Sequence, residues 1–237
     1  MLLEFLICEP ADAYHSKSKE YLTSHALADF RESPLLYRKR QLGLLKAEGN
    51  RAAFLIGQAT HTLVLEGRQA YEEWVGRHGL TAPQAALVEE MAAAVGCHPI
   101  AKELLAEGVA EGVVRCEYRD IPCQARLDWL NPVRGLIDLK TCENLKFFEN
   151  DVKTFGYVHQ LAFYRALLAQ VFGEKFPAYL VAVEKREPFR CGVWRIDPDV
   201  LDVAERENEV AIDRLAQCRQ MNYWPTGYEE LRVLNHI

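Results

Sequence analysis

The chain has 237 residues, of which 49% are hydrophobic and 26% charged, a composition that predicts a globular protein with a sizeable core. The formal net charge of -6 excludes a generally basic surface that coats nucleic acid, so any polyanion site must be a local basic groove. The seven cysteines form no C-x-x-C pair and disfavour structural zinc, and the apolar start at residues 1–8 is too short for a membrane helix. We therefore expect a reduced, cytoplasmic protein with no membrane partner.

The first half of the chain is predicted to be helical after a strand or packed arm at residues 1–8. Thr23 and Ser24 are both good N-caps for a helix that runs to Ser33-Pro34. Residues 50–65 are apolar on nearly all sides, which indicates a buried helix. Weaker helical patterns cover residues 69–77, 83–95 and 99–107.

The second half begins with a β pattern. Strands are predicted over residues 113–119, 123–130 and 136–141, with turns at 120–122 and 131–135, and these form a three-stranded meander. A helix over 152–172, strands over 178–185 and 190–196, and an acidic helix from Asp197 to about 219 follow. This order predicts an α/β (mixed α+β) fold with helices around a central mixed sheet. We expect one domain over 1–237, with a helical elaboration over about 1–110 and a core over about 111–197.

Three charged side chains occupy the predicted hairpin, namely Asp128, Asp138 and Lys140. Because side chains alternate along a strand, Asp138 and Lys140 share one face. The polar pair is therefore directed at a single place. The opposite, apolar face is expected to hold Leu127, Ile137 and Leu139.

The length of the turn decides whether both carboxylates meet. If the turn over 131–135 has an odd length, Leu130 pairs with Leu136 and Asp128 lies opposite Asp138. Directly opposite β-carbons are about 4.5–5.5 Å apart. A turn of even length places the two carboxylates on opposite faces.

Two neighbouring carboxylates need a compensating cation, because burial of unpaired charges costs several kcal/mol. Lys140 supplies one positive charge, and a divalent metal with oxygen ligands balances the remainder. Such a metal polarises a phosphoryl oxygen and activates a bound water. The spacing therefore suggests metal-assisted phosphoryl hydrolysis, with an ordinary surface ion pair as the alternative.

Two further segments carry polar residues where a core helix normally has Leu or Ile. Gly57-Gln-Ala-Thr-His61 places one histidine in an apolar helix, either as a ligand or as a core histidine bonded to a carbonyl. Tyr157, Gln160 and Tyr164 follow the spacing of one helical face. This stripe is either part of a site or an interface with scattered polar tips.

The ordered set of these motifs resembles the PD-(D/E)XK nuclease superfamily, in its RecB-like branch. The matching residues, between about 22 and 196, are Gly57-x-x-x-His61, Asp128, Asp138-Leu-Lys140 and Gln160-x-x-x-Tyr164. The wider layout, with Ser33-Pro34 and residues 183–188, is similar to the phage and prophage RecE-type exodeoxyribonuclease VIII group.

The resemblance implies a restriction-endonuclease-like sheet with the catalytic hairpin at its middle. It implies Mg²⁺, with Mn²⁺ able to substitute, and Lys140 as the residue that positions the attacking water. The implied metal ligands are His61, Asp128, Asp138 and the carbonyl of Leu139. Gln160 and Tyr164 would complete the catalytic set, with Tyr157 beside them. The chain departs from the pattern in having Asp138 where many members have Glu, and it lacks the cysteines of an iron–sulfur cluster.

The implied activity is metal-dependent 5′ to 3′ exonuclease digestion of linear double-stranded DNA. The implied partners are DNA ends, a single-strand annealing protein and further copies of the chain in a homo-oligomeric ring. The candidate DNA contacts are Arg31, Ser33, Arg38 and Tyr157, with Arg31 and Ser33 at a 5′ phosphate. Other basic residues nearby are Lys39, Arg40, Lys46 and Arg51.

Several alternatives stay open at this stage. The chain could be a catalytically silent nucleic-acid-binding relative, a RecB-like endonuclease, or a structural protein whose hairpin carries a surface ion network. Glu184 is either a residue near the site or a solvated charge. The acidic stretch over 197–213 is expected to repel DNA or to face a partner subunit.

Overall fold

The computed structural model describes residues 6–45 and 51–233. Most of the predicted N-terminal arm, residues 1–5, lies outside the described residues, as do Lys46 and Asn50. Ile7, at the end of that arm, forms an isolated antiparallel bridge with Val113. Within the described residues, no helix is long and apolar enough to cross a membrane.

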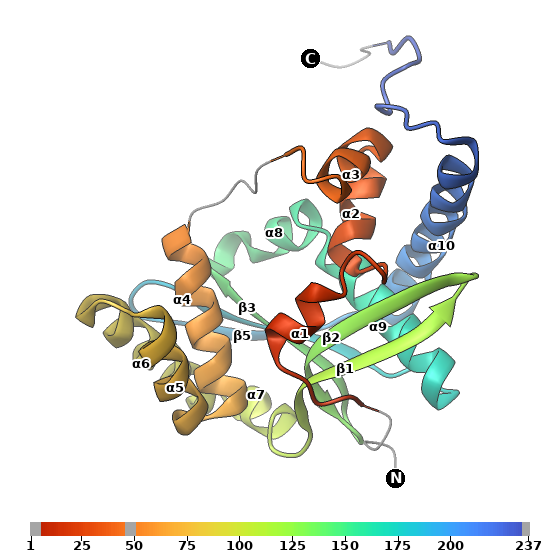
Figure 1. Cartoon of the computed structure of the whole chain (residues 1–237). Coiled ribbons are helices and arrows are strands. Elements are labelled where there is room, and N and C mark those ends of the chain that lie inside the picture. The colour runs from red at the N-terminus through yellow and green to blue at the C-terminus, as the bar shows by residue number, and fades with distance from the viewer. Residues whose placement is uncertain (1–5, 46–50, 234–237) are drawn as a thin grey trace.

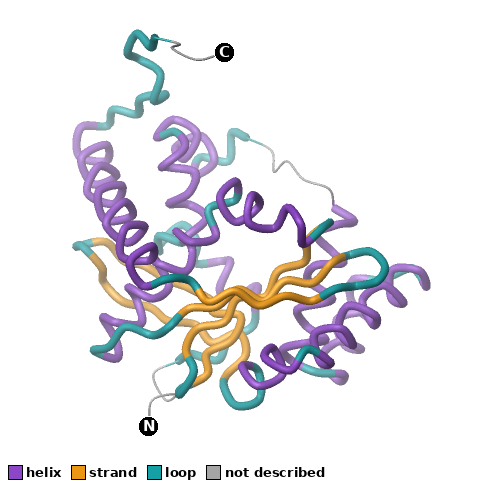
Figure 2. The backbone as a smooth tube through the Cα atoms, turned by 180° about the vertical axis from the view of Figure 1, so that it is seen from behind, coloured by secondary structure: helices purple, strands orange, loops and turns teal. Residues whose placement is uncertain are grey.

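Five strands form one mixed sheet in the order β1-β2-β3-β4-β5 (Figures 1 and 2). The first three strands are the predicted antiparallel meander, β3 and β4 are parallel, and β4 and β5 are antiparallel. The strands are β1 (Val109–Tyr118), β2 (Ile121–Asn131), β3 (Gly135–Cys142), β4 (Ala178–Glu184) and β5 (Cys191–Arg195). The expected α/β architecture, a mixed sheet flanked by helices, is confirmed.

The helices precede the sheet, connect its strands or, in the case of the last helix, follow it (Figure 1). Those before the sheet are α1 (Ala11–Ser16), α2 (Ser24–Glu32), α3 (Pro34–Gln41), α4 (Arg51–His61), α5 (Arg68–His78), α6 (Ala82–Cys97) and α7 (Pro99–Leu104). Those after β3 are α8 (Phe148–Thr154), α9 (Tyr157–Phe172) and α10 (Pro198–Met221). Thr23 caps α2 and Asp197 caps α10, as the sequence predicts.

Two hydrophobic clusters lie on the two faces of the sheet. Leu136 and Leu180 pack into a cluster with α2, α9 and α10. Ile137 and Leu139 pack into the other cluster with α4, α5, α6 and α7. Because alternate residues of β3 enter different clusters, Asp138 and Lys140 lie on the face that α9 covers.

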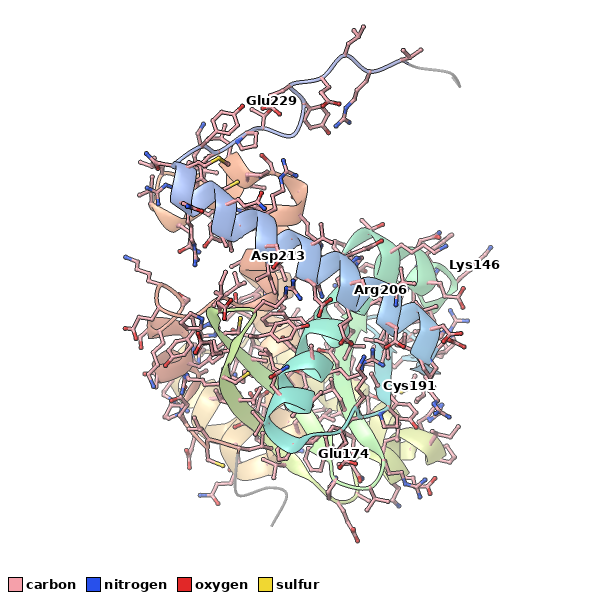
Figure 3. All side chains as sticks on the ribbon, turned by 90° about the vertical axis from the view of Figure 1, so that its right-hand side faces the viewer. Lys146, Glu174, Cys191, Arg206, Asp213 and Glu229 are labelled. Atoms are coloured by element: carbon pink, nitrogen blue, oxygen red, sulfur yellow. The ribbon has the colours of Figure 1, made fainter. Side chains whose placement is uncertain are left out.

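The acidic helix α10 lies across α9 (Figure 3), and ion pairs hold it against its neighbours. Asp202 and Glu205 both contact the buried Arg165 of α9, and Asp213 contacts Arg119 at the end of β1 at 2.6 Å. Basic groups of the same chain therefore neutralise part of this acidic surface.

Three predicted elements differ from the observed ones. The helix expected over 50–65 is α4 followed by a π-helical turn, Thr62–Glu66. The helix expected over 152–172 is two helices, because Gly156 adopts the left-handed conformation with φ 66° between α8 and α9. The turn expected at 120–122 lies at Arg119 and Asp120, which have φ 50° and 58°, a two-residue hairpin turn.

The expected position of Leu127 is wrong. Leu127 packs into the α9 cluster, whereas Ile137 and Leu139 pack into the α4 cluster. Along β2, Ala125 and Leu127 face α9, and Leu130 faces it again. The alternation of side chains therefore shifts by one residue between Leu127 and Leu130, which is where Asp128 lies.

Candidate active site

Three carboxylates lie on neighbouring strands at the same level of the sheet. Ala110 pairs with Trp129 and Gly112 with Leu127, so Glu111 of β1 lies opposite Asp128. On the other side, Leu130 pairs with Leu136 and Trp129 with Ile137, and the next residues of the two strands are Asp128 and Asp138. The odd turn and the Leu130–Leu136 pair are confirmed, and Glu111 lies opposite Asp128, but the expected direct pairing of Asp128 with Asp138 is not formed, because the β2–β3 pairs end at Trp129–Ile137.

The ladder between β2 and β3 stops at this level. After the Trp129–Ile137 pair the two strands exchange no further regular pairs. Instead, Oδ2 of Asp128 accepts a hydrogen bond of 2.8 Å from the backbone N–H of Leu139. The Asp128 side chain thus fills the place where the strands separate, and this bond fixes its orientation.

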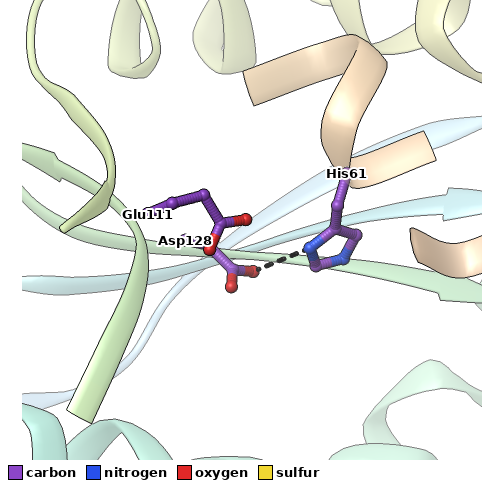
Figure 4. Close-up of side chains that lie close together, drawn as sticks. All are labelled: His61, Glu111 and Asp128. Carbon is purple, nitrogen blue, oxygen red and sulfur yellow. Dashed lines mark ion pairs between the residues drawn. The ribbon is translucent and has the colours of Figure 1, made fainter. Parts of the chain in front are cut away.

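His61, Glu111 and Asp128 come together as groups that could hold a metal ion (Figure 4). One ligand atom of each lies within 4.8 Å of those of the others, and His61 Nδ1 is 3.5 Å from Asp128 Oδ2. His61 is the last residue of α4, directly before the π-helical turn. Glu111 has φ 54°, a conformation that costs energy for a residue with a Cβ. Strained positions of this kind concentrate at functional sites.

The neighbouring basic side chains do not fully offset the burial of these carboxylates. Burial and the neighbouring Asp128 charge raise the pKa of Glu111 to about 8, although Arg126 lies 3.1 Å away and opposes the shift. Burial raises the pKa of Asp138 to about 6 against the opposing effect of Lys140. Burial also raises the pKa of Asp128. Each shift means that a further cation would stabilise the ionised form.

Lys140 joins the carboxylates to a polar chain on α9. Its Nζ lies 2.7 Å from Asp138 Oδ2 and donates to Gln160 Oε1 at 3.2 Å. Gln160 in turn donates to the hydroxyl of Tyr164 at 2.9 Å, and Ser24 of α2 donates to the same hydroxyl at 3.3 Å. Burial disfavours the charged lysine, but Asp138 and Asp128 outweigh that effect and raise the pKa of Lys140.

The remaining side of Lys140 faces an aromatic ring. Its Nζ lies 4.6 Å from the ring centre of Tyr157, a cation–π distance. The predicted helical stripe of Tyr157, Gln160 and Tyr164 is therefore one face of α9, and it is directed at Lys140.

The pKa of His61 is lowered, which favours its neutral form. Burial lowers its pKa to about 4, and the positive Lys140 acts in the same direction, while a hydrogen bond with the backbone of Leu139 opposes it. A neutral imidazole is the form that binds metals. The same contact places the backbone of Leu139, a predicted ligand, beside His61.

Among the predicted DNA contacts, Arg31 lies next to Tyr157, because a Cβ on Gly156 would be 3.4 Å from its Nη2. Arg31 donates to Asn208 of α10 at 2.5 Å, and Arg38 lies over the ring of Trp224 at 5.2 Å. Ser33 caps α3 by accepting from the N–H of Leu36 at 3.3 Å. Their role at a 5′ phosphate stays a prediction.

Of the two interpretations of Glu184, the solvated charge is wrong. Its side chain is 1% exposed, and it accepts hydrogen bonds from the N–H of Leu145 at 2.9 Å and from Arg190 at 2.6 and 2.8 Å. Glu184 thus anchors the segment after β3 to the β4–β5 hairpin.

Glu111 is the site residue that sequence reasoning missed. The predicted first strand began at residue 113, and the turn was placed one residue late. Recognising a two-residue turn at Arg119-Asp120 extends the hairpin until Glu111 faces Asp128. Ser24 was noticed only as a capping residue, and its bond to Tyr164 depends on tertiary packing.

The split hairpin, the row of carboxylates and the lysine on β3 define a PD-(D/E)XK-type α/β protein. More particularly, the chain belongs to the family described as the PDDEXK-like domain of unknown function (DUF3799), whose model matches residues 24–236. No curated protein matches it at the level of sequence.

One solved structure shares the fold, and two others are similar at lower TM-scores. A crystal structure from Eubacterium rectale, of a protein provisionally named an exonuclease, has a TM-score of 0.77 and 17% identity, over 98% of this chain and 96% of that one. Two structures of LHK-Exo, an alkaline exonuclease from Laribacter hongkongensis, match at 13% identity over 90% of this chain and 96% of theirs. Their TM-scores are 0.45, for the complex with dAMP, and 0.40.

Proposed function

We propose that this chain is a metal-dependent nuclease that hydrolyses phosphodiester bonds in DNA. The observation that carries the proposal is the split between β2 and β3, which places His61, Glu111 and Asp128 within 4.8 Å beside the Asp138–Lys140 pair. A structural ion network accounts less well for the row, because the three carboxylates of Glu111, Asp128 and Asp138 are paired with two strongly basic side chains, Arg126 and Lys140. Membership of a PDDEXK-like family and the similarity to a provisionally named exonuclease support the proposal.

The donor set suits a hard divalent cation. It offers two carboxylates and an imidazole. In the adjacent Asp138, Oδ1 is buried without a hydrogen-bond partner among the described residues, and Oδ2 is paired with Lys140. Mg²⁺ or Mn²⁺ would be held by His61, Glu111 and Asp128, with Asp138 and the Leu139 carbonyl as the further predicted ligands. When bound, the metal supplies Lewis-acid polarisation of the phosphoryl oxygen and activation of water.

The residues around Lys140 orient its ammonium group. Asp138 and Gln160 hold Nζ from two sides, and Tyr157 closes a third. A fixed ammonium can position a water or stabilise charge that develops on the phosphate. Tyr164 orients the amide of Gln160 so that its carbonyl oxygen faces the lysine.

The finer proposal is an exodeoxyribonuclease of the RecE type that degrades linear double-stranded DNA from the 5′ end. It rests on the resemblance of the ordered motifs and on the similarity to structures named exonucleases. The annealing partner and the homo-oligomeric ring are proposals on the same ground. The RecB-like endonuclease and the silent DNA-binding relative are the alternatives.

One digestion experiment separates these alternatives. Linear and closed-circular duplexes, each with Mg²⁺ or EDTA, are incubated with the protein, and the linear duplex is labelled at the 5′ or the 3′ end. Degradation of the linear DNA alone, with early loss of the 5′ label, supports the 5′ to 3′ exonuclease. Nicking of circles supports the endonuclease, and binding without cleavage supports the silent relative.

A further inference from the structure

An aromatic side chain that the site chemistry does not use lies next to Tyr157. Phe155 is 61% exposed and occupies the break between α8 and α9. Its ring stacks on that of Tyr157, with centres 5.7 Å apart and an interplanar angle of 28°. Exposed apolar residues are common, so the exposure alone carries no conclusion.

The position of Phe155 is what distinguishes it. The ring of Tyr157, on which it stacks, is the one that faces Lys140 Nζ at 4.6 Å. Phe155 therefore lies one ring beyond the residue in contact with the catalytic lysine. A nucleotide whose phosphate is bound at Lys140 has its base within reach of this ring.

The aromatic pair is rigidly held. The buried Phe148 contacts the ring of Tyr157 at 6.3 Å and the ring of Trp194 at 4.7 Å, which anchors Tyr157 to β5. Gly156, with φ 66°, allows the tight connection that presents Phe155. A rigid aromatic surface loses little conformational entropy when a flat ligand stacks on it.

A positive group lies beside the same connection. A Cβ on Gly156 would be 3.4 Å from Nη2 of Arg31, so the guanidinium lies against the backbone between the two rings. Cations combined with exposed aromatic rings are the usual surface for an unpaired strand of nucleic acid. Negative phosphates next to a stacked base are therefore favoured here.

We propose that Phe155, supported by Tyr157, is a stacking platform for an unpaired nucleobase of the strand whose phosphodiester enters the site. The inference rests on the proposed nuclease function and names its substrate more closely: the strand is single-stranded next to the cleaved bond. Stacking on the platform compensates for the stacking that the base loses when it leaves the duplex.

The test is a binding experiment on the whole chain with Ca²⁺ in place of Mg²⁺. Fluorescence anisotropy measures the affinity for a ten-nucleotide single strand and for versions with one abasic site at each position in turn. The wild type is expected to lose roughly ten-fold in affinity at one abasic position, which corresponds to about 1.4 kcal/mol, a typical value for a single stacked base.

Substitutions at Phe155 test whether this loss of affinity is due to stacking on Phe155. Phe155→Leu should bind the intact strand and the strand with that abasic site with almost equal affinity. Phe155→Trp should still show the ten-fold difference in affinity between them. Phe147→Leu is the matched control, because Phe147 is also exposed, at 52%, and its ring contacts the ammonium of Lys146 at 5.7 Å rather than the ring of Tyr157. Equal unfolding midpoints for the variants show that the fold is unchanged.

The proposal is overturned if no abasic position weakens binding by the wild type, or if Phe155→Leu keeps the full loss. It is also overturned if Phe147→Leu abolishes that loss as Phe155→Leu does. The proposed nuclease function can fail separately. If binding depends on a base through Phe155 but no DNA is cleaved, the nuclease proposal is refuted and the stacking proposal is not.

Discussion

Two buried carboxylates on adjacent parts of the sheet behave in opposite ways. Asp138 and Glu184 are each 1% exposed, but the pKa of Asp138 is raised to about 6 and that of Glu184 is lowered to about 2. Glu184 accepts three hydrogen bonds from Arg190 and Leu145. Asp138 has Lys140 beside it and other carboxylates nearby.

The difference separates a structural ion pair from a cluster of carboxylates whose burial is compensated only in part by Lys140 and Arg126. The bonds to Glu184 compensate its burial within the chain, so it stabilises the fold. The carboxylates around Asp138 lack that compensation, and folding retains them at a cost. A cost of this kind is expected where the missing charge comes from a ligand.

The largest expected effect is on catalysis. Lys140→Ala should lower the rate of DNA hydrolysis by about a hundred- to a thousand-fold, because the group held by Asp138 and Gln160 to stabilise developing charge is lost. Metal binding should persist, as measured by calorimetry with Mn²⁺. The control is Lys185→Ala, because that lysine has the same 17% side-chain exposure and pairs with Glu143 instead. Equal losses of rate in both variants would contradict the role of Lys140.

Metal should stabilise the folded chain through the carboxylates of the candidate site and not through carboxylates in structural ion pairs. At a hundred times its dissociation constant, Mn²⁺ should raise the unfolding free energy of the wild type by about 2.7 kcal/mol. Asp128→Asn should lose most of this gain, because one charged donor of the cluster disappears. Asp213→Asn, which removes a carboxylate that pairs with Arg119, should retain it. Thermal unfolding with EDTA or Mn²⁺ measures both, and an equal gain in the two variants would place the metal elsewhere.

Removal of the structural carboxylate should destabilise the chain with or without metal. Glu184→Gln should cost about 2 kcal/mol in urea unfolding, because charged hydrogen bonds to Arg190 are lost. Glu143→Gln, an exposed pair with Lys185, should cost less than about 0.5 kcal/mol.

The same pair gives a pH dependence with a fixed sign. The pKa of Glu184 is lowered on folding from 4.5 to about 2, so its stabilisation is complete above pH 4.5 and is lost as the pH falls towards 2. The difference in unfolding free energy between the wild type and Glu184→Gln should therefore be constant from pH 8 to 5 and should become smaller below pH 5. A difference in unfolding free energy that grows as the pH falls would contradict the role of the ionised Glu184 in this pair.

The smallest expected effect is a gain in stability. Without metal at neutral pH, Glu111→Gln should raise the unfolding free energy by about 1 kcal/mol. Folding raises the pKa of Glu111 from 4.5 to about 8, so the wild type must protonate this side chain on folding, and glutamine avoids that cost. The same variant should bind Mn²⁺ more weakly than the wild type. Loss of stability in EDTA would show that the bond between Glu111 and Arg126 matters more than the cost of protonation.

The sequence alone determined the type of fold and part of the site. Alternation in β3 places Asp138 and Lys140 on one face, and an odd turn aligns Asp128 with them, because both follow from local backbone geometry. The stripe of Tyr157, Gln160 and Tyr164 follows from the helical period. The division at Gly156 was missed, because one glycine inside a helical pattern does not by itself fix a break.

Only the tertiary structure decided how these parts combine. Glu111 joins Asp128 because a two-residue turn sets the register of β1, and His61 joins them because α4 packs against β3. The hydroxyl of Ser24, 140 residues from Tyr164 in the chain, reaches it through the packing of α2 on α9. Such contacts depend on long-range packing, which no local period or propensity encodes. The sequence thus determined which groups share a face, and the fold decided which of them share a site.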